Sequence, residues 1–159
     1  MTTSPPFFGK YRGSCSEVDA KTMRIKALIP AVLGATPSGW CEACVPYAGP
    51  QVGFVMLPEV GSGVWIEFEG GDVSYPIWVG GYWRDGETPP DADADIKAIV
   101  AKTGSLAFDN NGSKVTLQDA DQHTVVVDSN GVTLTGGSAG KVAVGASSVS
   151  VNDGALEVS

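Results

Sequence analysis

57-LPEVGSGVWIEFEGGDVSYPIWVGGYW-83 is the stretch of sequence on which the fold depends. Within residues 63–69, an apolar side chain at every second position alternates with Trp65 and two glutamates, which is typical of a half-buried strand. Residues 70–72 (Gly-Gly-Asp) allow a sharp reversal, and residues 76–83 return as a second strand that begins at a proline. Glycines are expected at the bulges and corners of a small barrel, and here they occupy positions 61, 63, 70, 71, 80 and 81. The stretch predicts a barrel hairpin with its tryptophans in the core.

The residues before this hairpin predict further short strands. Residues 7–13 and 23–29 alternate apolar with basic side chains and are expected to form a first hairpin around a polar turn. Residues 43–47 predict a short third strand after a loop, and residues 54–57 lead into the central hairpin. Five or six strands in about 80 residues, without a helical period, favour an antiparallel OB-type barrel, with a sandwich as the alternative.

The distribution of aromatic residues divides the chain. All four Trp, all four Tyr and four of the five Phe lie in residues 1–83, so the globular core is expected to end near Trp83. Residues 84–95 (RDGETPPDADAD) hold five acids and a Pro-Pro pair, which predicts a solvated linker. The predicted organisation is therefore a barrel over 1–83, a linker over 84–95 and a different domain over 96–159.

Residues 96–159 predict a regular series of short strands. Pairs of apolar residues, separated by one residue, recur every 7 to 10 positions, with Asn-Gly and Asp-Gly turn signals between several of them. This regular spacing predicts a β-helix or β-prism. Its core is assigned to Leu106, Phe108, Val115, Leu117, Val125, Val127, Val132, Leu134, Val142, Val144, Val149, Val151, Leu156 and Val158.

The energetics of this tail favour a homotrimer. Each strand has about two aliphatic side chains to bury, which at roughly 25 cal/mol per Å² barely offsets the entropy lost by ordering the chain. If three chains wind around one axis, each apolar face meets the others and the strand edges are paired. A solenoid formed by a single chain is the structural alternative.

Charge and composition exclude several classes of protein. The net charge of −8 disfavours binding to nucleic acid or to anionic lipid. No apolar run approaches the roughly 20 residues of a membrane span, and the N-terminus lacks the apolar core of a secretory signal. Synthesis and assembly in the cytoplasm of the producing cell are therefore expected, with the three cysteines reduced.

Several motifs in the N-terminal part resemble one family. They are P-Y-A-G over residues 46–49, P-E-V-G over 58–61, V-W-I-E-F-E-G-G-D over 64–72 and Y-P-I-W-V-G over 75–80. In this order and spacing the chain resembles the central spike of contractile injection machines, which include the phage baseplate assembly protein V group, type VI secretion spikes and extracellular injection systems. The residues that carry the resemblance are Pro46, Tyr47, Gly49, Pro58, Glu59, Gly61, Phe68, Gly71, Asp72, Pro76 and Gly80.

The resemblance implies an OB-fold at the centre of a baseplate, joined to a trimeric β-helix that is driven into a target membrane when a sheath contracts. The chain lacks the larger hub domain of some relatives and the His-x-His pair that binds iron at some tips, since its single histidine is His123. The expected partners are therefore two further copies of the chain, a separate hub protein at the barrel and a separate tip protein of the PAAR type at the C-terminal end. The expected location is the tail of a virion or the baseplate of an injection particle.

No residue pattern predicts a catalytic, cofactor or metal site. The pair Cys41 and Cys44 has the spacing of half a zinc ribbon, but no second pair exists, and Cys44 is expected to be an apolar strand residue. Residues 135–142 lack the required features of a phosphate loop, and residues 91–102 lack those of a calcium loop. A small basic face made by Lys10, Arg12, Arg24 and Lys26 is expected to meet another subunit.

The sequence thus predicts a non-enzymatic trimeric spike with a mechanical role. The alternative from another class is a soluble OB-type module that binds glycan or protein and carries a solenoid tail. A cell-wall hydrolase is a third hypothesis, disfavoured because no acid/base pair is visible. The mass in solution separates the first two.

Overall fold

The computed structural model describes residues 5–90, 92–137 and 140–158, which form two compact units divided between Thr88 and Pro89. Almost all of the regular structure is β-strand, as predicted. The exceptions among the described residues are α1 (Pro30–Leu33) and two short 3₁₀ turns, η1 (Glu69–Gly71) and η2 (Asn152–Gly154). No helix in the described part of the chain has the length and apolar character needed to span a bilayer.

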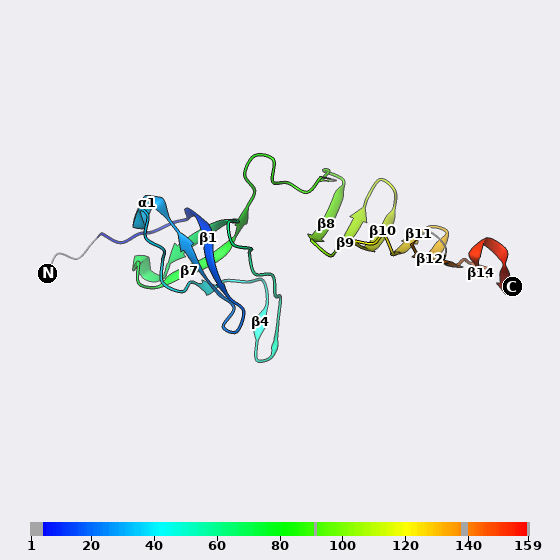
Figure 1. Cartoon of the computed structure of the whole chain (residues 1–159), viewed down its shortest axis with the longest axis horizontal. Coiled ribbons are helices and arrows are strands. Elements are labelled where there is room, and N and C mark those ends of the chain that lie inside the picture. The colour runs from blue at the N-terminus through cyan, green and yellow to red at the C-terminus, as the bar shows by residue number, and fades with distance from the viewer. Residues whose placement is uncertain (1–4, 91, 138–139, 159) are drawn as a thin grey trace. The chain divides into compact units, whose positions relative to one another are not determined.

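Five strands of the N-terminal unit form one curved sheet, in the order β2-β1-β6-β7-β3, which is the half-barrel of an OB-type domain (Figure 1). Their bounds are β1 (Tyr11–Asp19), β2 (Arg24–Leu28), β3 (Glu42–Ala43), β6 (Gly63–Phe68) and β7 (Pro76–Tyr82). Neighbouring strands are antiparallel except for β3 and β7, which are parallel. The hairpin predicted over residues 63–83 is therefore confirmed as two adjacent strands of this sheet.

The core of this unit lies on one face of the sheet. In β6 the side chains of Val64, Ile66 and Phe68 are buried while Trp65 and Glu67 are not, as the period-2 pattern predicts. The nine buried apolar residues are Cys15, Ile25, Ala27, Ile29, Cys41, Val64, Ile66, Phe68 and Trp78. The expectation that the tryptophans of the stretch 57–83 lie in the core is wrong in part, because Trp78 is buried while Trp65 is only partly buried and Trp83 is exposed.

Strand boundaries before the central hairpin differ from the prediction. The first strand begins at Tyr11 rather than Phe7 and continues to Asp19, through residues expected to form the turn. A bulge between Cys15 and Glu17 interrupts the alternation of apolar and polar side chains. The strand itself continues through this bulge, so the sequence pattern ends before the strand does. The predicted loop after Ile29 contains the single helical turn α1, which has Pro30 at its start.

The third predicted strand is also different. Only Glu42 and Ala43 pair with β7, and the chain then forms a separate two-stranded sheet from β4 (Ala48–Gly49) and β5 (Val52–Gly53). Residues 54–57, expected to lead into the central hairpin, follow β5 and form no strand. Cys44 is exposed and outside any strand, whereas Cys41 is buried in the core.

Eight strands of the C-terminal unit form one antiparallel sheet in which each strand pairs with its neighbours in sequence (Figure 1). They are β8 (Ile96–Ala101), β9 (Gly104–Asp109), β10 (Lys114–Asp119), β11 (Thr124–Asp128), β12 (Gly131–Gly136), β13 (Gly140–Val144), β14 (Val149–Val151) and β15 (Leu156–Val158). The predicted series of short strands is confirmed. A single-chain solenoid would instead stack parallel strands from successive turns, and that alternative is wrong.

Candidate assembly surface

The register of the C-terminal sheet places thirteen of the fourteen predicted tail residues on one face, in two continuous rows, while the side chain of the fourteenth, Val158, lies outside the described part of the chain. Residues on directly paired positions share a face of an antiparallel sheet. The first row is Ile99, Leu106, Leu117, Val125, Leu134, Val142, Val151 and Leu156, and the second begins at Lys97 and continues with Phe108, Val115, Val127, Val132, Val144 and Val149. We call these two rows the aliphatic face.

The aliphatic face is largely open to solvent in one chain. Phe108, Leu117 and Leu156 are 45, 54 and 59% exposed, although they lie at the alternate strand positions that would face a core in a closed domain. A single sheet with no second layer has nothing on which to pack this face. Contiguous apolar surface of this kind marks an interaction site.

The opposite face of the same sheet has a different character. Apart from Val126, the paired positions between the two rows carry small or polar side chains, namely Ala98, Ala107, Thr116, Thr133, Ala143 and Ser150. The two faces therefore differ in the way expected of a sheet with one buried and one solvated side. The aliphatic face is the side that is suited to burial.

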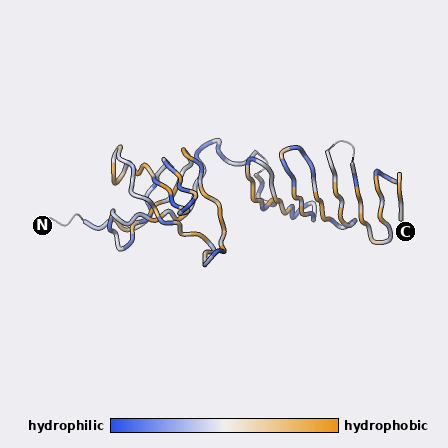
Figure 2. Tube along the Cα trace, turned by 60° about the horizontal axis from the view of Figure 1, so that its bottom comes forward, coloured by the Kyte–Doolittle hydropathy of each residue, from blue (hydrophilic) through white to orange (hydrophobic). Residues whose placement is uncertain are grey.

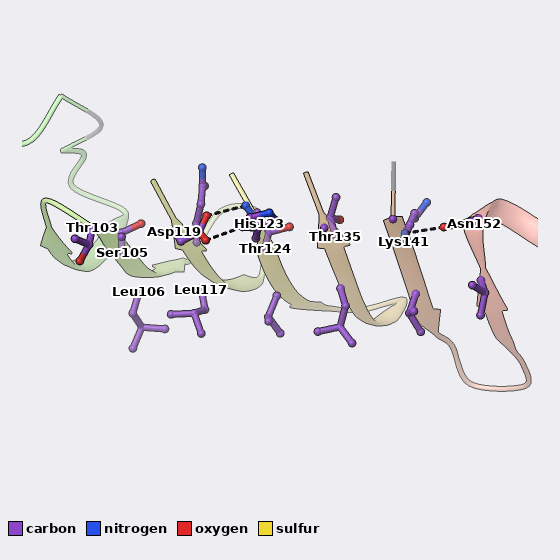
Figure 3. Close-up of a pocket in the computed structure, with 18 of the residues that line it drawn as sticks. Thr103, Ser105, Leu106, Leu117, Asp119, His123, Thr124, Thr135, Lys141 and Asn152 are labelled. Atoms are coloured by element: carbon purple, nitrogen blue, oxygen red, sulfur yellow. Dashed lines mark hydrogen bonds and ion pairs between the residues drawn. The ribbon is translucent and has the colours of Figure 1, made fainter. Parts of the chain in front are cut away.

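An open groove of about 840 Å³ runs along the sheet and is lined by seven members of the first row (Figure 3). Figure 3 shows Leu106 and Leu117 projecting to one side of the strands, whereas Thr124 and Thr135 lie on the other. Ile99 belongs to this row although the sequence analysis did not assign it. The sequence offers no clear signal for it, because residues 96–101 carry apolar side chains at both alternating sets of positions.

One polar cluster lies at the β10–β11 turn and was not predicted. Oδ1 of Asp119 accepts hydrogen bonds from the backbone N–H groups of Asp121 and His123, and its Oδ2 lies 2.7 Å from Nδ1 of His123 (Figure 3). These bonds lower the pKa of Asp119, and the hydrogen bond to Asp119 raises the pKa of His123. Side-chain ligand atoms of Asp119, Asp121 and His123 lie within 4.8 Å of one another, but the bonds are those of a closed turn.

The glycines of the N-terminal motifs occupy positions of unusual backbone geometry. Gly61 and Gly71 have positive φ angles of 95° and 78°, and each takes part in a backbone hydrogen bond that joins distant segments, to Cys15 and to Phe7. Gly80 (φ 146°) lies at the bulge where β7 skips one residue against β6. These positions give the half-barrel its corners.

The remaining motif residues lie in turns or at strand ends. Pro76 and Phe68 are buried and face each other across β6 and β7. In the turn that precedes β7, the carboxylate of Asp72 accepts a hydrogen bond from the backbone N–H of Ser74. The others are on the surface or partly buried, in and after the β4–β5 hairpin: Pro46, Tyr47, Gly49, Pro58 and Glu59.

Three of the four cations of the predicted basic face are paired with acids of the N-terminal unit, and the fourth, Arg12, lies against aromatic rings. Lys10 pairs with Glu67, Arg24 with Glu42, and Lys26 with Glu17. The guanidinium of Arg12 lies 5.2 and 5.1 Å from the ring centroids of Trp65 and Tyr82. Because of these contacts, the four cations do not form the patch of unpaired positive charge that binds the phosphate backbone of a nucleic acid.

The two cysteines with zinc-ribbon spacing do not form a joint site. Burial raises the pKa of the Cys41 thiol, which also lies 3.3 Å from the hydroxyl of Ser38, while Cys44 is exposed. Burial raises the pKa of Cys15 in the same core. The thiols of Cys15 and Cys41 are therefore protonated and unreactive, and they pack in the core as small apolar groups.

Comparison with protein families gives one match for each unit. Residues 11–83 match the model of the type VI secretion system/phage-baseplate injector OB domain. Residues 98–157 match the model of the phage baseplate V C-terminal trimerisation domain, and this range contains thirteen of the fourteen predicted tail residues. A comparison with curated proteins found no match.

Proposed function

The chain belongs to the phage baseplate V family of spike proteins, and from this premise we propose that it is the central spike of a contractile tail or injection machine. Its family gives it a structural role in the baseplate, with an OB domain and a trimerisation domain. The observation that carries the finer proposal is the aliphatic face, which is continuous from β8 to β15 and consists of exposed and partly buried side chains.

In the proposed homotrimer, three C-terminal sheets turn their aliphatic faces inward around one axis. The resulting β-prism buries the two rows and leaves the small and polar face in solvent. Close packing of three sheets makes such a shaft stiff along its length. Residues 84–95 act as the linker between this shaft and the barrel.

The proposed mechanism is mechanical. The N-terminal barrel docks on a separate hub protein, a separate conical tip protein of the PAAR type covers the C-terminal end, and sheath contraction drives the shaft through the target membrane. The trimer is assembled in the cytoplasm of the producing cell and resides in the virion tail or particle baseplate. Neither catalysis nor a cofactor is required for this role.

Complementation tests this function. Producer cells that lack the chain are supplied with the wild type or with Val127→Asp, which places a charge on the aliphatic face. Wild-type preparations are expected to depolarise target cells, whereas preparations from cells supplied with the variant, whose tail cannot trimerise, are expected to show no depolarising activity. Variant particles that depolarise targets as well as the wild type does would contradict the proposal.

The partners are tested separately with purified proteins. The chain is mixed with the candidate tip protein, and with the candidate hub, and each mixture is passed over a sizing column. Stable co-elution with both is expected. If the chain elutes alone from both mixtures, the proposed binding to a hub and to a tip protein is wrong.

A further inference from the structure

The β4–β5 hairpin is an apolar arm on the N-terminal unit. It comprises residues 47–56, and its two strands form a sheet of their own that joins neither of the larger sheets (Figure 1). The hairpin is closed by the pairs Ala48–Gly53 and Gly49–Val52 and by a hydrogen bond of 2.8 Å from Phe54 N–H to the Tyr47 carbonyl. Two-stranded hairpins are only marginally stable in water, so this arm needs a surface on which to pack.

The arm is exposed and carries no charge. Residues 43–58 contain no Asp, Glu, Lys or Arg, in a chain whose net charge is −8. In Figure 2 part of this segment has the orange colour of hydrophobic residues, while its turn does not. The large apolar side chains on the arm are 41 to 65% exposed: Tyr47 58%, Val52 51%, Phe54 41%, Val55 65% and Met56 47%.

A second exposed hairpin in the same unit shows the contrast. The β1–β2 tip also exposes two apolar side chains, Val18 and Met23. It is surrounded by charge, since its neighbours include Glu17, Asp19 and Lys21. That tip has the usual character of a solvated hairpin, whereas the arm has the composition of a buried contact.

Another copy of the chain is the occupant that the molecule itself supplies. The C-terminal unit belongs to a trimerisation domain, so two further N-terminal units are tethered near each arm. The connection from Trp83 to Asp95 spans at most roughly 45 Å when fully extended. Tethers of this length hold domains at effective concentrations on the order of millimolar, at which a small apolar contact forms.

We propose that the apolar arm of each chain packs against the N-terminal unit of a neighbouring copy, forming a second contact between subunits apart from the tail. Three arms and three receiving surfaces related by a three-fold axis close a ring without leaving an arm unpaired. The inference rests on the proposed homotrimer.

Photo-crosslinking of the full-length chain tests the arm. A benzophenone amino acid replaces Val55 in one preparation and Val18 in a matched control, and the mass of each is first measured by light scattering. After illumination, denaturing gels are expected to show covalent dimers and trimers from the Val55 label, with crosslinks that map to residues 11–83. The Val18 label is expected to give few or none.

Three results would overturn the inference. They are a trimeric preparation in which the Val55 label gives no covalent dimer, crosslinks only within one chain, and equal yields from the two labels. A monomeric mass would instead refute the homotrimer on which the inference rests.

A label at Val52 allows a second readout. The double change Phe54→Ser/Val55→Ser is expected to lower its inter-chain crosslinking at least about fivefold while the mass stays trimeric, because exposed apolar contact is lost without disturbing the core. Unchanged crosslinking in that variant would show that the apolar side chains of the arm do not make the contact.

Discussion

Gly63 shows how closely one residue can limit the half-barrel. It is buried in β6, and a Cβ atom at this position would lie 2.7 Å from the carbonyl oxygen of Tyr82 and 2.9 Å from its ring. Gly81, at the neighbouring pair of the same two strands, has its nearest atom at 3.4 Å. A side chain is therefore excluded at Gly63 by close contacts, whereas Gly81, on the neighbouring strand, has room for a methyl group.

Gly63→Ala is expected to destabilise the N-terminal unit by about 1–3 kcal/mol, because the new methyl group forces β6 and β7 apart. Gly81→Ala, the matched control, is expected to change the free energy of unfolding by less than about 0.5 kcal/mol. Denaturant unfolding followed by tryptophan fluorescence measures this unit, since all four tryptophans lie within residues 1–83. Equal changes in the free energy of unfolding from the two substitutions would show that β6 can shift to make room for the methyl group.

His123 gives a pH-dependent readout at the same scale. Its pKa is raised by the hydrogen bond to Asp119, so this contribution to stability is full below the unfolded value of about 6.5 and is lost as pH rises through the folded pKa. The pKa of Asp119 is lowered, so its contribution is present above the unfolded value of about 3.9 and is lost as pH falls through the folded one. The turn is therefore expected to be firmest at mildly acidic pH.

An NMR titration checks this directly, since His123 is the only histidine in the chain. Asp119→Asn is expected to bring the pKa of His123 back toward its ordinary value, and Asp121→Asn, which removes a smaller interaction, is expected to lower it less. A His123 titration that does not respond to Asp119→Asn would contradict the hydrogen bond.

At the scale of elements, adjacent residues of β11 test the assignment of faces. Val127 lies on the aliphatic face and Val126 on the opposite one. Val127→Asp is expected to abolish the trimer, because it would bury three unpaired charges close together. Val126→Asp, the same change one residue away, is expected to leave the trimer intact.

Native mass spectrometry of both variants gives the comparison. Trimers from both variants would show that the aliphatic face is not the subunit interface. Loss of the trimer in Val126→Asp alone would reverse the assignment of the two faces.

The tail was predictable from sequence because one physical rule dominates it. Side chains alternate strictly across short strands, and turns of similar length separate them, so the period-2 pattern identified every described residue of the two rows except Lys97 and Ile99. Ile99 was missed because β8 is apolar at both alternating sets of positions, which hides its faces. The role of these residues as a trimer core stays a prediction.

The N-terminal unit was less predictable, since long-range pairing decides its boundaries. β1 pairs with β2 along most of its length and with β6 at its start, and its bulge shifts the pattern. α1 is four residues long, too short to produce a helical period. The β4–β5 arm has two-residue strands, which no alternation can identify, although its lack of charge was visible in the sequence.

The two units of the molecule differ in how completely a single chain can bury their apolar residues. The N-terminal unit has its own buried core, whereas the described part of the C-terminal unit contains no fully buried side chain. A chain of this design completes its tail only by associating with other copies, since one sheet alone does not exclude water from its apolar face. The central claim is therefore that three aliphatic faces form one common core.

Light scattering of the purified full-length chain tests that claim most directly. One chain has a mass of 16.4 kDa, so the account predicts a single species of about 49 kDa, three times that value, which persists on dilution to micromolar concentration. A stable, folded species of 16.4 kDa would contradict it, because the aliphatic face would then remain in water.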